Sequence, residues 1–450
     1  HPTKSAYTDG AGLTNLAVCP AQTTIATVTT TFGPGDNLII VPTQFTSTDT
    51  GTESVTVGVY NGATLLAQNQ YTIDVGLSGT QNTHTLLAKE TAVANPIYTV
   101  KACTSATAVN GEAKIMAISG MTNTAYTDGA STTVTPSASV DTTIATRTTT
   151  LPIGNNIILA SVQLDNAATA QDIPAGAIKI KNNAGTVIAT NERAISMSAN
   201  VLPTDKPSIL LIARDVSLSA NPTYTVTART VSASTAEAKI IAFQPAQSFF
   251  VDSASAAVAI SPGTVIANLP TTLTNRDEVV VIGTGQFEDT VNTTVESLAA
   301  TTGFTLKEGT TARSSNQYLT NGLAGFGSAG DGSSQALVWR TASPGTSPTY
   351  SMSAIASAAG LQGEGKLTAF SVSTINSPPD ANAGPDALSN EGTLVTLAGS
   401  ATDPDGDTIS YNWIQTVGPS VTIISPTSAT ATFTAPSVGS SGATLTFQLT

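Results

Sequence analysis

The six residues AYTDGA at positions 6–11 decide the organisation of this chain, because they return unchanged at positions 125–130. Later in each unit, ANPIYTV at 94–100 returns as ANPTYTV at 220–226, and a looser third copy contains SPTYS at 347–351. A period of about 120 residues is the size of a domain and exceeds the 20 to 50 residues of solenoid repeats. The sequence therefore predicts an array of related domains.

The repeats divide the 450 residues into four predicted domains. Three related β-sandwich units span residues 1–121, 122–246 and 247–373, and a different module spans 374–450. Each unit is large enough to bury its own core. We expect the domains to follow one another like beads on a string, an arrangement that builds length or surface more readily than a single active site.

Charged residues make up only 10% of the chain, and the formal net charge is −13. Nucleic-acid binding needs clustered Lys and Arg, and the sequence has no basic run, so we expect no nucleic-acid partner. The acidic balance also argues against docking on anionic lipid. No run of about 18 apolar residues occurs, so we expect no membrane span.

Thr, Ser, Ala, Val and Gly dominate the composition, which favours β-sheet because β-branched side chains suit a pleated surface. Short apolar or alternating runs between Gly, Pro, Asn and Asp clusters are typical of strands and turns. In the first unit they predict seven strands, at residues 23–31, 37–43, 54–60, 64–72, 84–88, 97–103 and 112–118. The Asn61-Gly62 pair predicts a type I′ hairpin. The fold class is therefore all-β, as tandem Ig-like or jelly-roll sandwiches.

Cys19 and Cys103 are the two cysteines of the chain, and both lie in the first unit. One is near the first predicted strand and the other ends a late strand, so we predict a disulfide between them. Two separately buried thiols are the alternative. The chain begins with His1, which we interpret as the product of removal of an export signal. Both features predict an extracellular or cell-surface location.

The repeats end at a polar, Pro-rich linker, STINSPP at 373–379. It is followed by GSATDPDGD at 399–407 and YNW at 411–413. The region from Pro378 to Thr450 resembles the polycystic-kidney-disease-type (PKD) and related Ig-like modules of microbial surface proteins. The resemblance implies a spacer or interaction domain without chemistry of its own. It also implies one more strand, so we expect the protein to continue beyond Thr450, with a strand from a neighbouring molecule as the alternative.

Asp403, Asp405 and Asp407 alternate around a Gly in this module. Carboxylates spaced in this way can converge on a hard cation that takes six to eight oxygen ligands. They are candidate ligands of a calcium ion, and Asp380 and Asp386 are weaker candidates. The alternative is a solvated acidic turn whose side chains cap backbone amides.

Acidic and basic residues also recur within the repeats. Asp9 and Asp128 each precede a Gly, which we interpret as a turn in preference to an ion site. Lys114, Lys239 and Lys366 each follow a Glu by two residues, so the Lys and the Glu share one face of a strand. An exposed pair of this kind contributes at most about 1 kcal/mol.

An isopeptide bond from these lysines to Asn37 or Asn156 is a less favoured alternative, because the third unit lacks the Asn. A basic residue recurs at the end of an apolar strand as Lys89, Arg214 and Arg340. We predict that it occupies a structural ion-pair position.

Catalytic patterns are absent from the sequence. His1 and His84 are the only histidines, and there is no P-loop, zinc-ligand spacing or nucleophile elbow. We therefore expect that the chain is not an enzyme. Asn292 begins the only N-glycosylation sequon and is a candidate glycan site.

These features favour a structural subunit of an S-layer, sheath or extracellular filament that associates with itself. Weakly charged faces can pack laterally, and calcium could bridge acidic subunits. An adhesin or carbohydrate-binding stalk would need exposed aromatic platforms, and only 5% of residues are aromatic. A non-catalytic accessory region of a larger secreted protein, or a virion or tail component, is the third hypothesis. Glycans are a further candidate partner.

Overall fold

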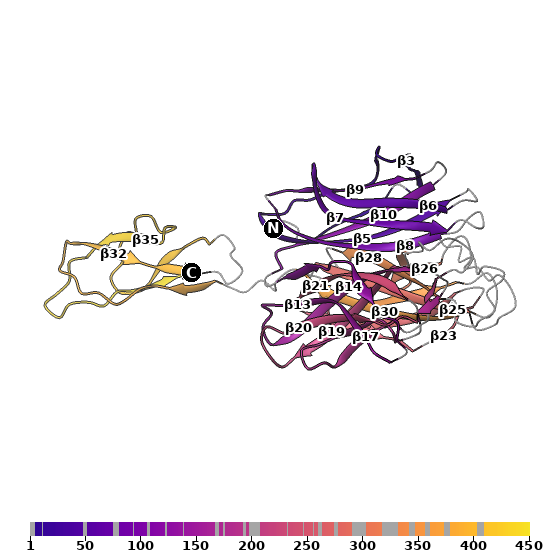
Figure 1. The fold of residues 1–450 in the computed structure, drawn as a ribbon. Helices are drawn as coiled ribbons and strands as arrows, with labels where there is room; N and C mark the ends of the chain where they lie inside the picture. Colours follow the sequence, from indigo (N-terminus) through magenta and orange to yellow (C-terminus); the bar gives the residue numbers. More distant parts are fainter. Residues whose placement is uncertain are drawn as a thin grey trace. The chain divides into compact units, whose positions relative to one another are not determined.

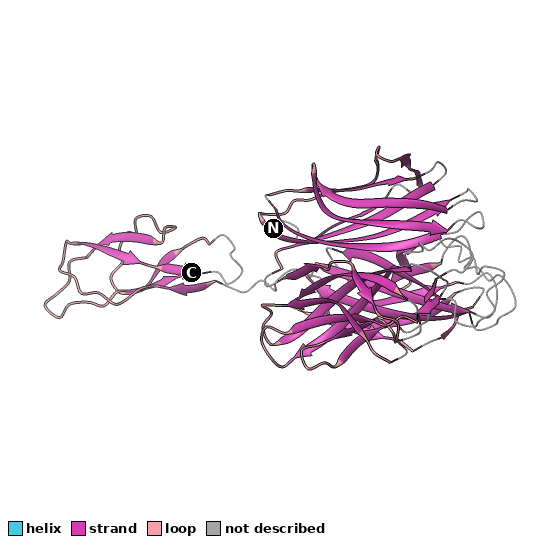
Figure 2. Cartoon of the chain, in the orientation of Figure 1, coloured by secondary structure: helices cyan, strands magenta, loops and turns pink. Residues whose placement is uncertain are grey.

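A computed structural model gives the fold of the chain. The described residues form strands and loops and contain no helix (Figure 2), which confirms the all-β class. They fall into two compact units, His1–Ser373 and Thr374–Thr450. The structure describes residues 5–450 except 11, 48–51, 75–80, 93, 106–108, 122–123, 138, 167–170, 174–175, 192–194, 198–207, 232, 246, 255, 260–262, 274–277, 290–302, 317–331, 342–346, 356–360, 373–378 and 403–408.

The first repeat is a sandwich of two sheets (Figure 1). One sheet has the strand order β1-β10-β5-β8 with β2 beside β10, and the other has the order β3-β9-β6-β7 with β4 beside β9. Eight main strands paired in this way form a jelly roll and not the seven-stranded Ig arrangement. The strands are β1 (Ser5–Asp9), β2 (Thr14–Asn15), β3 (Ala17–Val18), β4 (Thr23–Thr29), β5 (Gly35–Ser47), β6 (Thr52–Asn61), β7 (Thr64–Asp74), β8 (Gln81–Ala92), β9 (Ile97–Thr104) and β10 (Val109–Ser119).

The second repeat follows the same plan. Its sheets have the orders β11-β21-β14-β19, with β12 beside β21, and β13-β20-β16-β17, and β15 pairs with β18. The strands are β11 (Ala125–Asp128), β12 (Thr132–Val134), β13 (Thr142–Thr148), β14 (Gly154–Asn166), β15 (Gln171–Ile173), β16 (Lys179–Lys181), β17 (Val187–Thr190), β18 (Ile195–Met197), β19 (Ser208–Ser217), β20 (Thr223–Ala228) and β21 (Ser234–Phe243).

The third repeat is again two sheets, β22-β30-β25-β28 with β23 beside β30, and β24-β29-β26-β27. The strands are β22 (Ser248–Asp252), β23 (Ala256–Ala257), β24 (Thr264–Pro270), β25 (Val279–Asp289), β26 (Phe304–Glu308), β27 (Thr311–Asn316), β28 (Gly332–Thr341), β29 (Thr349–Ala354) and β30 (Leu361–Ser371). The strand plan of the first repeat is therefore present three times.

All seven strands predicted in the first unit are present, as β4 to β10. The predicted β6–β7 hairpin is present, but Asn61 pairs with Thr64, so the two turn residues are Gly62 and Ala63. Of these two residues only Gly62 has a positive φ, 58°, so the turn is not type I′. β1 was not among the predicted strands, and it pairs with β10 along its whole length.

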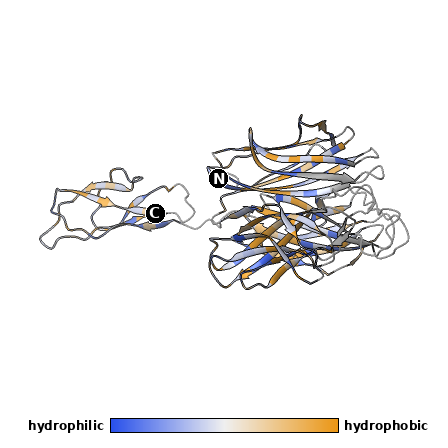
Figure 3. Cartoon of the chain, viewed as in Figure 1, coloured by the Kyte–Doolittle hydropathy of each residue, from blue (hydrophilic) through white to orange (hydrophobic). Residues whose placement is uncertain are grey.

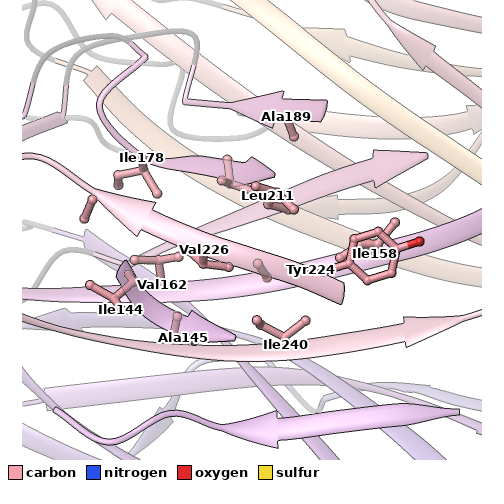
Figure 4. Close-up of a cluster of buried hydrophobic side chains, with 14 of the residues drawn as sticks. Ile144, Ala145, Ile158, Val162, Ile178, Ala189, Leu211, Tyr224, Val226 and Ile240 are labelled. Atoms are coloured by element: carbon pink, nitrogen blue, oxygen red, sulfur yellow. The ribbon is translucent and has the colours of Figure 1, made fainter. Parts of the chain in front are cut away.

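Each repeat buries an apolar core between its two sheets. In the second repeat, Ile158 and Val162 of β14 lie across from Tyr224 and Val226 of β20 (Figure 4). The Tyr224 hydroxyl accepts a hydrogen bond from Asn156 Nδ2 at 2.9 Å, so the ring fills the core while its polar end is satisfied. Figure 3 shows apolar residues gathered along the strands.

The three repeats are not separate beads, because they share a fourth core. One strand of each repeat, β5, β14 or β25, carries a continuous apolar run whose residues alternate between two cores. Ile39 and Val41 face the core of the first repeat, whereas Leu38 and Ile40 face the shared core. The shared core consists of Leu38, Ile40, Leu87, Met116, Ile118, Met121, Ile157, Leu159, Leu210, Ile212, Ile241, Phe243, Val280, Ile282, Ala336, Val338, Phe370 and Val372.

This second buried face explains the departure from beads on a string. A strand covered on both faces reads as a continuous apolar run instead of an alternating one. Burying one Val, Leu or Ile side chain contributes about 1.5 to 3 kcal/mol. Eighteen buried apolar side chains from all three repeats therefore make residues 1–373 one compact unit.

In its described part, the C-terminal unit forms two-stranded pairs: β31 with β33, β32 with β35, and β34 with β36. Trp413 at the start of β34 is buried, and its Nε1 donates to the Ser428 carbonyl at 3.1 Å. Phe433 and Phe447 pack with their ring centroids 4.7 Å apart. The strands are β31 (Asp380–Asn382), β32 (Leu394–Ala398), β33 (Ser400–Thr402), β34 (Trp413–Val417), β35 (Thr430–Thr434) and β36 (Thr446–Leu449).

Candidate functional site

The repeats contact one another through residues at their first strands. At β11 of the second repeat, the Tyr126 hydroxyl donates to the Leu87 carbonyl of the first repeat at 3.2 Å. Thr124 donates through Oγ1 to Asp36 Oδ2 at 3.3 Å, and its carbonyl accepts from Lys89 Nζ at 3.2 Å. Lys89 and Asp36 form an ion pair of 2.6 Å. The hydrogen bond from Lys89, followed by one from Thr91, holds the pKa of Asp36 below its usual value.

The first repeat docks on the third in the same way. The Ser5 backbone N–H donates to Glu278 Oε1 at 2.9 Å, and the Ser5 hydroxyl bonds to the same oxygen. Arg340 Nη2 lies 3.3 Å from that oxygen. The hydroxyls of Tyr7 and Ser314 are 3.5 Å apart. Ser5 therefore bonds to the acid of an ion pair as Thr124 does, whereas Tyr7, at the position of Tyr126, has a side-chain hydroxyl as its partner instead of a backbone carbonyl.

At the contact between the third and second repeats, a phenylalanine takes the place of the tyrosine, and a hydrogen bond to a neutral amide takes the place of the ion pair. Phe250 stands where the other repeats have Tyr and packs against the shared core, where Phe243 and Phe370 are 5.0 Å apart. Arg214 Nη2 donates to the neutral Asn155 Oδ1 at 2.8 Å. Among the residues that the structure describes, the predicted ion-pair position therefore holds an ion pair at Lys89 and Arg340, whereas Arg214 forms a hydrogen bond to an amide.

A Lys–Asp–Glu triad lies on the inter-repeat side of each repeat. Register places an Asp of the first strand directly opposite a Lys of the last strand, on the same face as the Tyr or Phe two residues earlier. The Glu two residues before each Lys lies on that face as well. The triads are Asp9–Lys114–Glu112, Asp128–Lys239–Glu237 and Asp252–Lys366–Glu364.

Each triad Lys contacts both of its carboxylates. Lys114 and Lys239 form close ion pairs with Asp9 and Asp128, and Lys366 Nζ lies 2.5 Å from both oxygens of Asp252. The Glu oxygens lie at 3.6 Å in the first repeat, 2.7 Å in the second and 3.9 Å in the third. Every triad therefore holds one cation between two acids.

The lysine side chains are only 3–4% exposed, although the Asp side chains are 43–49% exposed. These are therefore not exposed surface pairs, and Lys114 shares its strand face with Met116, which packs in the shared core. Burial raises the pKa of Glu112, with Lys114 opposing and Asp9 adding to the effect. Burial, followed by the charges of Asp9 and Asp128, raises the pKa of Tyr7 and Tyr126.

The predicted Asp-Gly turns are wrong. Asp9 and Asp128 end strands, and the glycine after each continues the pairing by donating to a carbonyl of the last strand at 3.0 Å. A Cβ on Gly10 would lie 2.5 Å from the Ala113 oxygen. Glycine is required here because two backbones approach closely, and not because a turn needs a positive φ.

Asn37 and Asn156 do not lie at the lysines. Their Nδ2 atoms donate to the buried hydroxyls of Tyr98 and Tyr224 at 2.8 Å and 2.9 Å. The isopeptide alternative with these asparagines is therefore excluded. The motif ANPxYTV that the repeats share supplies these tyrosines and so has a role in the cores.

Cys19 and Cys103 are joined by a disulfide with a Cα–Cα distance of 5.2 Å. It ties β9 to the segment between β3 and β4. Asp403, Asp405, Asp407 and Asn292 lie outside the described residues.

Asp380 and Asp386 are both exposed. Among the residues that the structure describes, no three His, Cys, Asp or Glu side chains are grouped to hold a metal ion. Calcium binding therefore stays a prediction. The same residues include no helix long and apolar enough to cross a membrane.

The comparisons with solved structures return virus proteins of low similarity. A chain from the atomic structure of Sulfolobus turreted icosahedral virus is 10% identical, with 81% of this chain and 90% of that chain covered and a TM-score of 0.20. A chain from a structure described as the triple jelly roll fold and turret assembly in an archaeal virus is 9% identical, with 81% and 91% covered and a TM-score of 0.19. A chain of infectious bursal disease virus strain Gx is 8% identical, with 82% of each chain covered and a TM-score of 0.18.

At these TM-scores the likenesses carry no argument about function, and the jelly-roll fold rests on the strand orders given above. No curated protein matches the chain. Residues 383–450 match the family described as K319L-like, PKD domain, which confirms the resemblance of the C-terminal unit to PKD-type modules.

Proposed function

We propose that the chain is a structural subunit of an extracellular surface assembly, such as an S-layer, sheath or filament. The shared core carries the proposal. Apolar side chains from three jelly rolls are buried together, and hydrogen bonds join the repeats at the edges of this core, where Lys89–Asp36 and Arg340–Glu278 form ion pairs within their own repeats. Such a unit is suited to transmitting load and setting spacing, and on this proposal it has no catalytic activity of its own.

The outer sheets offer faces that suit lateral packing. Thr24, Thr27 and Thr29 are exposed along β4, and β13 exposes Thr at the matching positions. Uncharged hydroxyl faces repel one another little, and strands such as β4 and β13 lie at sheet edges, where another chain can pair. These faces support self-association over binding to a charged partner.

The net charge of −13 supports a second part of the proposal, which is that divalent cations such as calcium bridge subunits. The PKD-type unit would act as a spacer. Its one described tryptophan, Trp413, is buried in its core, and Trp339 is buried in the third repeat. Neither forms an exposed platform of the kind that a carbohydrate-binding stalk would need.

Electron microscopy of the purified native protein, with calcium and with a chelator, tests the proposal. Ordered sheets, tubes or filaments are expected, and they should disassemble on chelation if calcium bridges them. Assemblies that stay ordered after chelation would support the structural role but rule out bridging of the subunits by calcium. Dispersed single molecules in both conditions, at any concentration tested, would overturn self-assembly.

A further inference from the structure

The Lys–Asp–Glu triads are kept in all three repeats, whereas the disulfide occurs in one and the ion pair at the docking position in two. A buried ion pair seldom adds net stability, because the desolvation of its charges offsets their attraction. Three copies of one arrangement, with a second carboxyl group beside each buried amine, suggest that the triads do more than pair charges.

We propose that each triad forms a covalent cross-link: the Lys ε-amine and the Asp side-chain carboxyl condense to an amide, with the neighbouring Glu as the proton carrier. The bonds would join Asp9 to Lys114, Asp128 to Lys239 and Asp252 to Lys366. The structure shows these pairs in contact before reaction.

The reaction balances without a further reactant. Glu takes a proton from the Lys ammonium group and passes it to the Asp carboxylate, and the lone pair freed on Lys Nζ attacks Asp Cγ to form the C–N bond. Glu then takes a second proton from the nitrogen and passes it to the departing hydroxyl. One C–O bond breaks and one water molecule leaves. No oxidation or reduction occurs.

The geometry favours this condensation. Strand pairing holds Asp and Lys as direct cross-strand partners, and well-oriented groups in one molecule reach effective molarities of about 10⁵ to 10⁸ M. The lysine side chains are buried and so shielded from water. Burial raises the pKa of Glu112, so its acid form is populated at higher pH than in a solvated Glu.

The positions of these bonds would let each repeat resist unfolding under mechanical load in an extracellular assembly. Each joins the first strand of a repeat to its last, across sequence separations of 105, 111 and 114 residues. Pulling on the ends of a cross-linked repeat would load the amide directly, and the strands between would stay folded. The cross-links would form with or without calcium and in any type of assembly.

The mass of the intact full-length protein, measured after denaturation and reduction, tests the proposal. Three bonds lower the mass by about 54 Da relative to the sequence, about 18 Da for each water molecule lost. Lys114→Arg keeps the charge but cannot form the amide, and its mass deficit should be about 36 Da. Digestion should yield branched peptides that join the Asp and Lys segments. A wild-type mass equal to that of the sequence would overturn the proposal.

Two controls separate the cross-link from other losses of water. Asp9-Gly10 can form a succinimide that also loses about 18 Da. A deficit that is unchanged in Lys114→Arg, without branched peptides, would identify that product and overturn the amide. Glu112→Gln keeps Asp9 and Lys114, and in this variant the first bond should be missing or form at least about tenfold more slowly. An unchanged rate would remove Glu112 from the proposed role.

Discussion

The first and second repeats share one strand plan but fasten the same end of the sandwich by different means. In the first, a disulfide ties Cys103, within β9, to Cys19. In the second, Arg229 takes the place of Cys103, as the register of β9 and β20 shows, and it lies 3.9 Å from Asp141. Asp141 also pairs with Lys179 and Lys181, each at 2.9 Å.

The cores differ at the position of His84 in β8. His84 is buried in the first repeat, and the register places Ile209 of the second repeat at its position. The neighbouring Thr43 is likewise matched by Val162. The repeat that has the disulfide therefore has polar residues, His84 and Thr43, at these two core positions. The repeat that has the Asp141 ion pairs has the apolar residues Ile209 and Val162 there. The jelly-roll plan therefore determines where the sheet end must be held together but not by which chemistry, a disulfide or ion pairs.

Removing the disulfide should have the largest effect. The sequence separation between Cys19 and Cys103 is 84, and opening a loop of that size costs about 4 to 5 kcal/mol by loop-closure entropy. Cys19→Ser combined with Cys103→Ser should lower the free energy of unfolding by that amount in chemical denaturation. Reductant should destabilise the wild type but not the variant. A loss below about 1 kcal/mol would show that the bond does not hold this end.

Removing the Asp141 ion pairs should lower the free energy of unfolding by less than removing the disulfide does. Burial tends to raise the pKa of Asp141, but Lys179 and Lys181 together hold it below its usual value. Asp141→Asn leaves three cations without their shared anion, and we expect a loss of about 2 kcal/mol, since the lysines are partly exposed and screened.

A double-mutant cycle that combines Asp141→Asn with Lys179→Met measures the interaction free energy between Asp141 and Lys179. The second substitution should cost less in the Asp141→Asn background than alone. Equal costs in both backgrounds would mean that the carboxylate and the lysine do not interact.

The sequence allowed the strands of the first repeat to be predicted but not how the repeats pack. Residues 38–41 are apolar without interruption, and this pattern indicates burial on both faces without naming the neighbour. The triads were missed for a related reason. Lys114 and Glu112 are close in sequence, but Asp9 is 105 residues from Lys114, and only the pairing of β1 with β10 brings it there. The AYTDGA repeat marked this strand, although we interpreted its Asp-Gly as a turn.

Lowering the pH should destabilise the first repeat through His84, whereas the second repeat has Ile209 at that position. Burial lowers the pKa of His84 well below its usual 6.5. Below about pH 6.5 the unfolded chain takes up a proton that the folded chain does not, so the free energy of unfolding falls by up to about 1.4 kcal/mol per pH unit. Above that pH His84 has no effect on the slope.

His84→Leu, which makes the first repeat more like the second, should remove this slope between pH 7.5 and 5.5. The difference between wild type and variant isolates His84 from Glu112, whose raised pKa acts in the opposite direction as pH falls. Parallel curves for the two proteins would mean that His84 is protonated without cost in the folded state.

The smallest expected effect is a gain. Asn155 accepts a hydrogen bond from Arg214, at the position where Asp36 of the first repeat pairs with Lys89. Asn155→Asp would replace the amide with a carboxylate, and because the site is exposed we expect a stabilisation of only about 0.2 to 1 kcal/mol. The gain should shrink as salt rises from about 0.05 M to 1 M, because screening acts on exposed pairs.

Ser248 sharpens this test. Its hydroxyl is buried and has no hydrogen-bond partner in the described part of the chain, whereas Thr124 and Ser5 at the matching positions bond to a carboxylate. If the introduced carboxylate reaches Ser248, Ser248→Ala should reduce the gain from Asn155→Asp. If Ser248→Ala leaves the stabilisation by Asn155→Asp unchanged, the introduced carboxylate interacts with Arg214 and not with Ser248. Loss of stability in Asn155→Asp would show that this contact differs from the other two in geometry as well as in charge.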